Sequence, residues 1–186
     1  TIRGEEYRDP RIMIRGLEQL ASLEPENLIG AHGPPFSGQQ EIKKIIINYR
    51  DTLQFLWDQT VRCANKGLTL NETINVIKLP RQFSEHYTTQ QLYGLVEHHV
   101  RQIYTGLFGW FDEDEANLFP VPLPERSQRL VEGFGGKARV REIIDASLTK
   151  NDFRWAIELS SWLVRGNFND LGIADAGELE LSLIHI

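Results

Sequence analysis

The sequence predicts a mainly α-helical protein with a short α/β stretch at its amino-terminal end. After residue 38, apolar residues recur at three- and four-residue steps, which is the period of a helix. Before that point, an amphipathic segment is followed by a short apolar run, "NLIGA", and then by a histidine and a Gly-Pro-Pro turn. The chain has 186 residues, 41% of them hydrophobic, so it can bury a substantial core. We therefore expect the architecture to change near residue 37.

The amino-terminal elements are a helix and a strand. Asp9 is a suitable N-cap, and Pro10 would occupy the first helical position. Pro25 ends the helical pattern, and residues 27–31 are expected to form a short buried strand. A helix, a strand and a loop in that order are typical of the end of an α/β unit, so residues 1–37 are interpreted as the end of one domain.

A long helix is expected to follow, over residues 38–66. Ser37 is its expected N-cap, and Gly67 is the expected C′ residue. The next helix carries a capping box, in which Thr69 caps the first turn and Glu72 reaches back to it. Proline at position 80 is expected to stop this second helix.

The remaining chain predicts one more helix, a linker and a helical hairpin. Residues 88–111 are expected to be helical, and residues 111–128, which include three prolines, are expected to be a linker. Residues 138–165 form an expected hairpin of two helices with its turn at "TKND", similar to one tetratricopeptide-like unit. Residues 38–180 are thus interpreted as one α-helical domain. The tail at 181–186, "LSLIHI", breaks from the composition before it and is expected to be non-biological.

Composition and charge exclude several classes of function. The net charge of −6 disfavours nucleic acid as a partner, and no basic stripe with interleaved aromatic residues overrides it. Cys63 is the one cysteine, which excludes an internal disulfide and a zinc site made of thiolates. The longest apolar run is a few residues, too short for a membrane span. The sequence does not assign a compartment.

His32 stands at the end of the expected strand, in "NLIGAHGPPFSG" at residues 27–38. The glycine and prolines that follow restrict the loop, so the imidazole would be held on a rigid support. A neutral imidazole is the commonest protein metal ligand and suits zinc. His32 is therefore either a metal or catalytic ligand, or an incidental polar residue beside a tight turn.

Other polar residues stand out in the third helical segment. His98 and His99 are adjacent, so on a helix they point in different directions and cannot easily chelate one ion. We expect one of them to face the core and the other the solvent. Tyr93 precedes Gly94 and could present a phenol into a cleft as a hydrogen-bond donor, or could pack with its hydroxyl at a rim. The acidic run at 112–115 is expected to be solvated surface.

Five motifs in order resemble the alkyl sulfatases of the metallo-β-lactamase superfamily. They are "NLIGAHGPPFSG", "YRDTLQFLWDQTVRCANKGLTLNETINVIKLP", "YGLVEHHVRQIYTGLFGWFD", "LVEGFGG" and "KNDFRWAIELSSWLV", and the resemblance that they carry covers roughly residues 3–165. The chain departs from the family at "DEDEA", where the family has an Asp-Gly-Asn-Pro turn, and at "GPPFSG", where several sulfatases have an aromatic-rich stretch.

The resemblance implies an architecture. Residues 1–37 would be the last helix and strand of the αββα metallo-β-lactamase-like catalytic domain, and residues 38–180 the α-helical alkyl sulfatase dimerisation domain. The chain would then be a fragment, with most of the catalytic domain upstream and a sterol-carrier-like domain downstream. The family implies a homodimer formed through the helical domain.

The resemblance also implies an activity: hydrolysis of an alkyl sulfate ester to an alcohol and sulfate at a binuclear Zn²⁺ site. His32 matches the last histidine ligand of the metal, and the other ligands belong to an upstream His-x-His-x-Asp-His motif that this chain lacks. Tyr93 matches a tyrosine that resembles a sulfate-contacting residue. His98 matches a histidine to which no role is assigned, and the catalytic residues are not assigned either.

Three hypotheses about function follow. The chain belongs to a zinc-dependent alkyl sulfatase, to another metallo-β-lactamase-fold hydrolase, or to a helical interaction module. An upstream metal motif in the full-length gene would favour an enzyme. One histidine cannot hold two zinc ions, so the chain alone is predicted to be inactive. Self-association through the helical region is also predicted, because four tryptophans offer apolar surface: Trp57, Trp110, Trp155 and Trp162.

Overall fold

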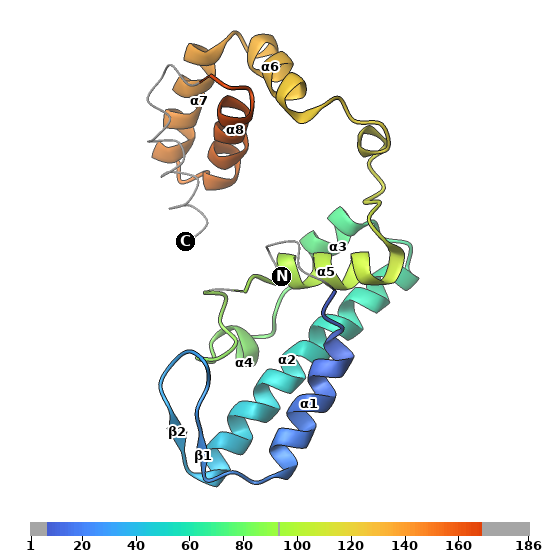
Figure 1. Ribbon diagram of the computed structural model, residues 1–186, viewed down its shortest axis with the longest axis vertical. Coiled ribbons are helices and arrows are strands. Elements are labelled where there is room, and N and C mark those ends of the chain that lie inside the picture. The colour runs from blue at the N-terminus through green and yellow to red at the C-terminus, as the bar shows by residue number, and fades with distance from the viewer. Residues whose placement is uncertain (1–6, 93, 169–186) are drawn as a thin grey trace. The chain divides into compact units, whose positions relative to one another are not determined.

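The computed structural model describes residues 7–92 and 94–168, which divide into two compact units at residues 114 and 115 (Figure 1). These residues form eight α-helices, one short 3-10 helix and one two-stranded sheet, so the predicted mainly α class is confirmed. None of the helices in these ranges combines the length and apolarity that a membrane-spanning segment requires. The predicted boundary at residue 37 lies inside the first unit and stays a prediction.

The first unit begins with α1 (Pro10–Ser22), capped as expected by Asp9, whose carboxylate accepts a hydrogen bond from the Arg11 amide at 2.9 Å. The helix lies along α2 (Gln39–Asn65), and Ile14 is buried. The guanidinium of Arg11 lies over the Trp57 ring of α2, 4.7 Å from the ring centroid. Packing on α2 therefore holds the short amino-terminal stretch to the helical part of the same unit.

The prediction of a buried strand over residues 27–31 is wrong in two respects, the burial of the strand and its length. The structure has a hairpin of two-residue strands, β1 (Asn27–Leu28) and β2 (Phe36–Ser37), paired antiparallel. Ile29 is 81% exposed. A strand is buried only where other layers cover it, and among the described residues the one strand that pairs with β1 is β2. Ser37 is likewise not the N-cap of the long helix: it belongs to β2, and its hydroxyl donates to Asn27 Oδ1 at 2.9 Å.

The long helix α2 confirms the predicted helical period. Its buried side chains recur at helical spacing, and Gly67 has a φ of +77° at the C′ position. The capping box is also confirmed: the amide of Glu72 donates to Thr69 Oγ1, and the amide of Thr69 donates to Glu72 Oε2. The capped helix, α3 (Leu70–Val76), is shorter than expected and ends before the proline at position 80.

The third helix also starts later than expected. After α3 come a one-turn helix, α4 (Arg81–Ser84), an irregular stretch, and then α5 (Val96–Phe108). The side chain of Gln91 accepts a hydrogen bond from the Val96 amide at 2.9 Å, which satisfies a free donor at the start of α5. Helices α2, α3 and α5 enclose the main core of this unit, formed by Leu56, Cys63, Leu70, Ile74, Ile77, Val96, Val100, Ile103 and Tyr104.

The second unit contains three helices. The predicted hairpin is confirmed as α7 (Lys137–Thr149) and α8 (Phe153–Arg165), with its turn at residues 150–152. A third helix, α6 (Leu123–Gly133), replaces part of the predicted linker. The prolines at 122 and 124 favoured a linker, yet they stand at the N-cap and in the first turn, where a helix tolerates proline. The core is Val131, Val140, Ile144, Ala156, Leu159 and Leu163.

Candidate functional site

His32 lies at the tip of the β1–β2 hairpin, and its side chain is exposed. The tip is a tight turn: a Cβ on Gly30 would lie 3.0 Å from the His32 carbonyl oxygen. Gly33 has a φ of +90°, a conformation that favours glycine. The glycines at positions 30 and 33 therefore let the backbone turn tightly around His32. The imidazole at this turn is exposed to solvent.

The side chains around His32 decide whether it can belong to a complete metal site. An exposed neutral imidazole is a suitable zinc ligand. Within residues 7–92 and 94–168, however, no group of three histidine, cysteine, aspartate or glutamate side chains lies close enough together to hold a metal ion. This part of the chain can supply one ligand and not a complete site. The metal role of His32 stays a prediction.

Tyr93, the predicted substrate-binding residue, lies outside the described residues. Its neighbour Gly94 makes a close approach to α5, because a Cβ at that position would lie 2.7 Å from His99 Nε2. A larger residue at position 94 would therefore displace the imidazole of His99.

His98 and His99 are both partly buried, so the expectation that one faces the core and the other the solvent is wrong. Burial lowers the pKa of both imidazoles below the ordinary value of 6.5. The Nδ1 atom of His98 is buried and has no hydrogen-bond partner among the described residues. Both rings therefore favour the neutral form in the folded chain.

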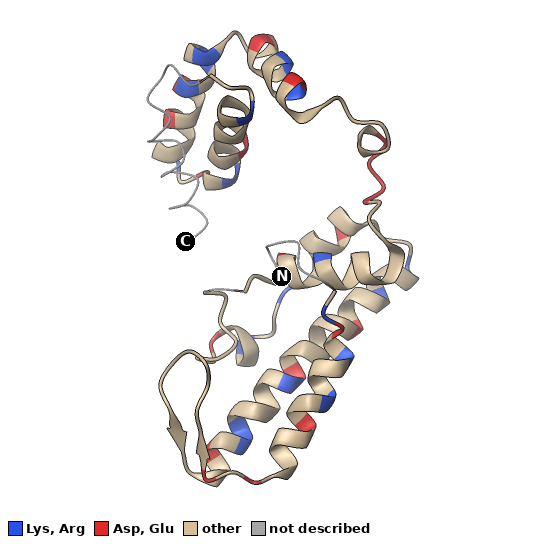
Figure 2. Cartoon of the chain, in the orientation of Figure 1, with Lys and Arg blue, Asp and Glu red and all other residues tan. Residues whose placement is uncertain are grey.

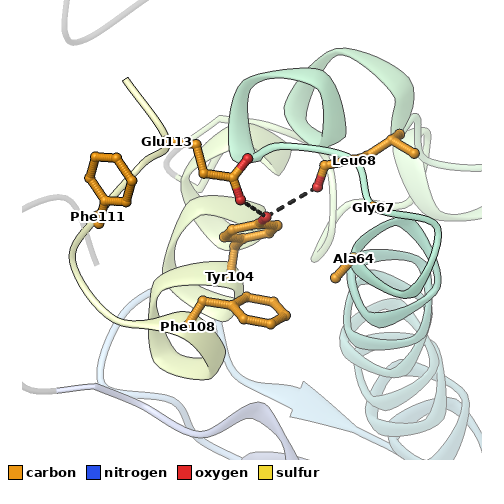
Figure 3. Close-up of a pocket in the computed structure, with 7 residues that line it drawn as sticks. All are labelled: Ala64, Gly67, Leu68, Tyr104, Phe108, Phe111 and Glu113. Carbon is orange, nitrogen blue, oxygen red and sulfur yellow. Dashed lines mark hydrogen bonds between the residues drawn. The ribbon is translucent and has the colours of Figure 1, made fainter. Parts of the chain in front are cut away.

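A pocket of about 260 Å³ lies at the carboxyl-terminal end of α5 (Figure 3). It is lined by residues from α2, the turn after it, α5 and the segment that follows: Ala64, Gly67, Leu68, Tyr104, Phe108, Phe111 and Glu113. Apolar side chains and polar groups share the lining, and the polar groups include one carboxylate, one phenol and the Leu68 carbonyl.

The hydroxyl of Tyr104 lies between two acceptors in this pocket (Figure 3). Its oxygen is 2.9 Å from Glu113 Oε1 and 3.1 Å from the Leu68 carbonyl oxygen. Burial, followed by the hydrogen bond to the Glu113 carboxylate, raises the pKa of Tyr104 to about 12. The phenol therefore stays protonated near neutral pH, and its one hydrogen is shared between two acceptors.

Neither Tyr104 nor Glu113 was predicted from the sequence to belong to a site. Acidic residues follow one another in the segment between α5 and α6 (Figure 2), and such a run is ordinarily solvated. Glu113 is exposed as expected, but one of its oxygens accepts from a buried phenol. It stands nine positions after Tyr104, a spacing that no helical or strand period connects. A φ of +68° at Glu113 bends the chain back and makes the contact possible.

The protein-family profile described as alkyl sulfatase dimerisation matches residues 69–179. A linear primary-alkylsulfatase of a Pseudomonas strain is 37% identical over 172 residues, which is 91% of this chain and 32% of that protein. An (R)-specific secondary-alkylsulfatase, also from Pseudomonas, is 33% identical over 97% of this chain and 27% of that protein.

A solved structure is similar as well. A stereoselective inverting sec-alkylsulfatase from Pseudomonas matches with a TM-score of 0.80 and 31% identity, over 98% of this chain and 29% of that one. The chain thus spans about a third or less of the length of these relatives.

Proposed function

Because the chain belongs to the alkyl sulfatase dimerisation family, we propose that it forms the dimerisation region, and the adjoining end of the catalytic domain, of an alkyl sulfatase. The whole protein would hydrolyse the sulfate ester of an alkyl chain to an alcohol and inorganic sulfate. The observation that carries this proposal is the extent of the similarity: two alkylsulfatases match over 91% and 97% of the chain, through both units.

Zinc is the proposed cofactor, bound as a pair of ions in the whole protein. His32 would contribute one ligand, since its imidazole is exposed at the tip of a tight hairpin. The remaining ligands would come from outside the described residues, which hold no cluster of three suitable donors. When bound, zinc would activate water and stabilise negative charge that develops on the sulfate group.

A substrate contact is proposed for Tyr93. A phenol can donate a hydrogen bond to an anionic oxygen, and the sulfate group of an alkyl sulfate offers several. Gly94, next in sequence, lies against His99 in the first turn of α5.

Self-association through the helical region is the proposed assembly, as a homodimer. The profile that matches residues 69–179 is a dimerisation profile, which supports this role. Three of the four tryptophans, at positions 57, 155 and 162, are partly buried and contact other rings or an arginine of the same chain. Trp110 is different, because it is 71% exposed and lies inside the matched residues. It is the indole best placed to contact a second copy.

The proposed activity is tested by measuring sulfate release from dodecyl sulfate, a primary ester, and from a secondary octyl sulfate. The longer protein that carries this chain should release sulfate from at least one of them and lose that activity, with part of its zinc, in His32→Ala. The matched control is His86→Asn, which removes an imidazole that contacts Thr88 in the same unit but leaves a side chain able to accept a hydrogen bond. Zinc-loaded protein that releases no sulfate from either ester would exclude the proposed activity.

The two other hypotheses predict different results. Another hydrolase with this helical region would bind zinc and lose it in His32→Ala, but would cleave a different ester. A purely helical interaction module would self-associate without binding zinc. Metal analysis and the ester assay on the same preparation therefore separate all three.

A further inference from the structure

One side chain from the irregular stretch before α5 reaches across to the hairpin that carries His32. The Tyr87 hydroxyl lies 3.9 Å from the position that a Cβ on Gly33 would occupy. The Tyr87 ring also meets the Phe36 ring edge to face, with centroids 6.4 Å apart and an interplanar angle of 68°. Gly33 directly follows His32, and Phe36 belongs to β2. Tyr87, which is 58% exposed, therefore packs with its ring on the second strand of the hairpin, and its hydroxyl lies near Gly33 at the tip.

The segment that carries Tyr87 is held against α2 by side-chain contacts. Thr89, two residues along, is buried, and its hydroxyl donates to the Phe83 carbonyl at 2.6 Å. The same hydroxyl accepts a hydrogen bond from Asn48 Nδ2 of α2 at 3.1 Å. The Phe83 ring is buried and packs on Phe55 of α2, with centroids 6.0 Å apart. Tyr87 thus projects from a segment anchored on both sides to the longest helix of the unit.

The hairpin needs such a support. Its strands have two residues each, and an isolated two-stranded hairpin is marginally stable in water. The tip between the strands is exposed, so the strand pairing alone does not fix the direction of the His32 side chain. Edge-to-face aromatic contacts stabilise a packed arrangement beyond the area that they bury. The packing of the Tyr87 ring on Phe36 therefore restricts where the second strand, and the tip that leads into it, can lie.

We propose that Tyr87 is a positioning residue for His32, acting through the packing of its ring on the hairpin. This rests on the proposed function, in which His32 is a zinc ligand. Metal ligands depend on groups around them that fix their direction, and loss of a group hydrogen-bonded to a ligand typically weakens metal binding by about tenfold to a hundredfold. Tyr87 acts one step further out, through the hairpin, so we expect an effect at the lower end of this range. The ring, and not the hydroxyl, carries this role, because the ring makes the contact with Phe36.

The first test is independent of zinc and uses the 186-residue chain. Backbone amide hydrogen exchange of residues 27–37 is compared between wild type, Tyr87→Ala, Tyr87→Phe and Leu92→Ala. Leu92 is 72% exposed in the same stretch and serves as the matched control. We expect exchange in the hairpin to become about two- to tenfold faster in Tyr87→Ala, the effect of losing one aromatic pair. Tyr87→Phe and Leu92→Ala should exchange like wild type.

Two results would overturn the proposal: unchanged hairpin exchange in Tyr87→Ala, or an equal acceleration in Tyr87→Phe, which would assign the contact to the hydroxyl. Far-UV circular dichroism checks that each variant is folded. If Tyr87→Ala does not fold, Phe36→Leu removes the other ring of the pair and should accelerate exchange at the tip in the same way; wild-type exchange in that variant would refute the role.

The second test uses the longer, zinc-loaded protein. Tyr87→Ala should retain zinc about tenfold more weakly against a chelator, with kcat lowered more than KM is raised, and Tyr87→Phe should restore both. If Tyr87→Ala keeps all of its zinc while His32→Ala loses zinc, the positioning role of Tyr87 is refuted and the metal role of His32 stands. Full retention in His32→Ala would refute the metal role of His32, whereas the exchange experiment would still report on the hairpin contact.

Discussion

Tyr104 and Glu113 are hydrogen-bonded, phenol oxygen to Oε1 at 2.9 Å, across the segment that leaves α5. The same phenol also reaches the Leu68 carbonyl in the turn between α2 and α3. One buried side chain therefore joins three parts of the first unit that are distant in sequence. The contact holds the segment after α5 against the helices that form the main core.

Replacing Tyr104 by phenylalanine should lower the free energy of unfolding by about 1 to 1.5 kcal/mol, the ordinary cost of losing a hydrogen bond while the ring is kept. Urea denaturation of the 186-residue chain, followed by circular dichroism, measures the change. Tyr49→Phe is the matched control, because Tyr49 is partly buried and its hydroxyl has no hydrogen bond within the described part of the chain. Equal effects in the two variants would contradict a specific role for the Tyr104 hydroxyl.

Tyr104 also predicts that the free energy of unfolding depends on pH in the alkaline range. Its pKa is raised from 10.0 to about 12, so the folded state holds the phenolic proton more tightly than the unfolded state does. The resulting stability is fully present below pH 10 and is lost as pH rises from 10 to 12. Other groups titrate in this range, so the measurement is the difference in unfolding free energy between wild type and Tyr104→Phe. That difference should shrink from pH 9 to pH 12, and a constant difference would refute the shift.

Local features were predictable from the sequence, and contacts between distant residues were not. The capping box of Thr69 and Glu72, and Gly67 at the end of α2, follow from residue types at fixed short spacings. The Tyr104–Glu113 pair and the Tyr87–Phe36 contact join residues with no such spacing. The prediction that residues 27–31 are buried was wrong for a related reason. An apolar run indicates that a strand can be buried, but it does not show which part of the molecule would cover that strand.

The capping box gives a prediction for α3. Thr69→Ala should destabilise the chain by about 1 kcal/mol, because it leaves the Glu72 amide without its partner at the helix start. Thr69→Ser keeps the hydroxyl oxygen and should remain close to wild type. The midpoint of urea unfolding separates the two variants. A serine variant as unstable as the alanine variant would assign the effect to the methyl group instead of the cap.

His98 and His99 predict a loss of stability in mild acid. Burial lowers the pKa of both below 6.5, so the folded state prefers the neutral imidazoles. This preference stabilises the fold above pH 6.5 and is lost as the pH falls below 6.5, where the unfolded state takes up protons more readily. Unfolding free energies of wild type and of the double variant His98→Gln, His99→Gln are compared from pH 7.5 to 5. Wild type should lose more stability than the variant over this range; parallel curves would exclude the histidines.

Two exposed apolar side chains of similar accessibility, Trp110 and Leu23, can show which part of the surface makes the self-association contact. Trp110 is 71% exposed and lies within residues 69–179, which match the dimerisation profile, whereas Leu23 is 69% exposed and lies outside them. Large aromatic residues contribute most of the affinity at many interfaces. Trp110→Ala should therefore weaken self-association at least about tenfold, and Leu23→Ala should leave it unchanged, in sedimentation velocity over a concentration series. A dimer that survives Trp110→Ala but dissociates in Leu23→Ala would move the contact to the amino-terminal helix, and a wild-type chain that stays monomeric at every concentration would refute self-association through this region.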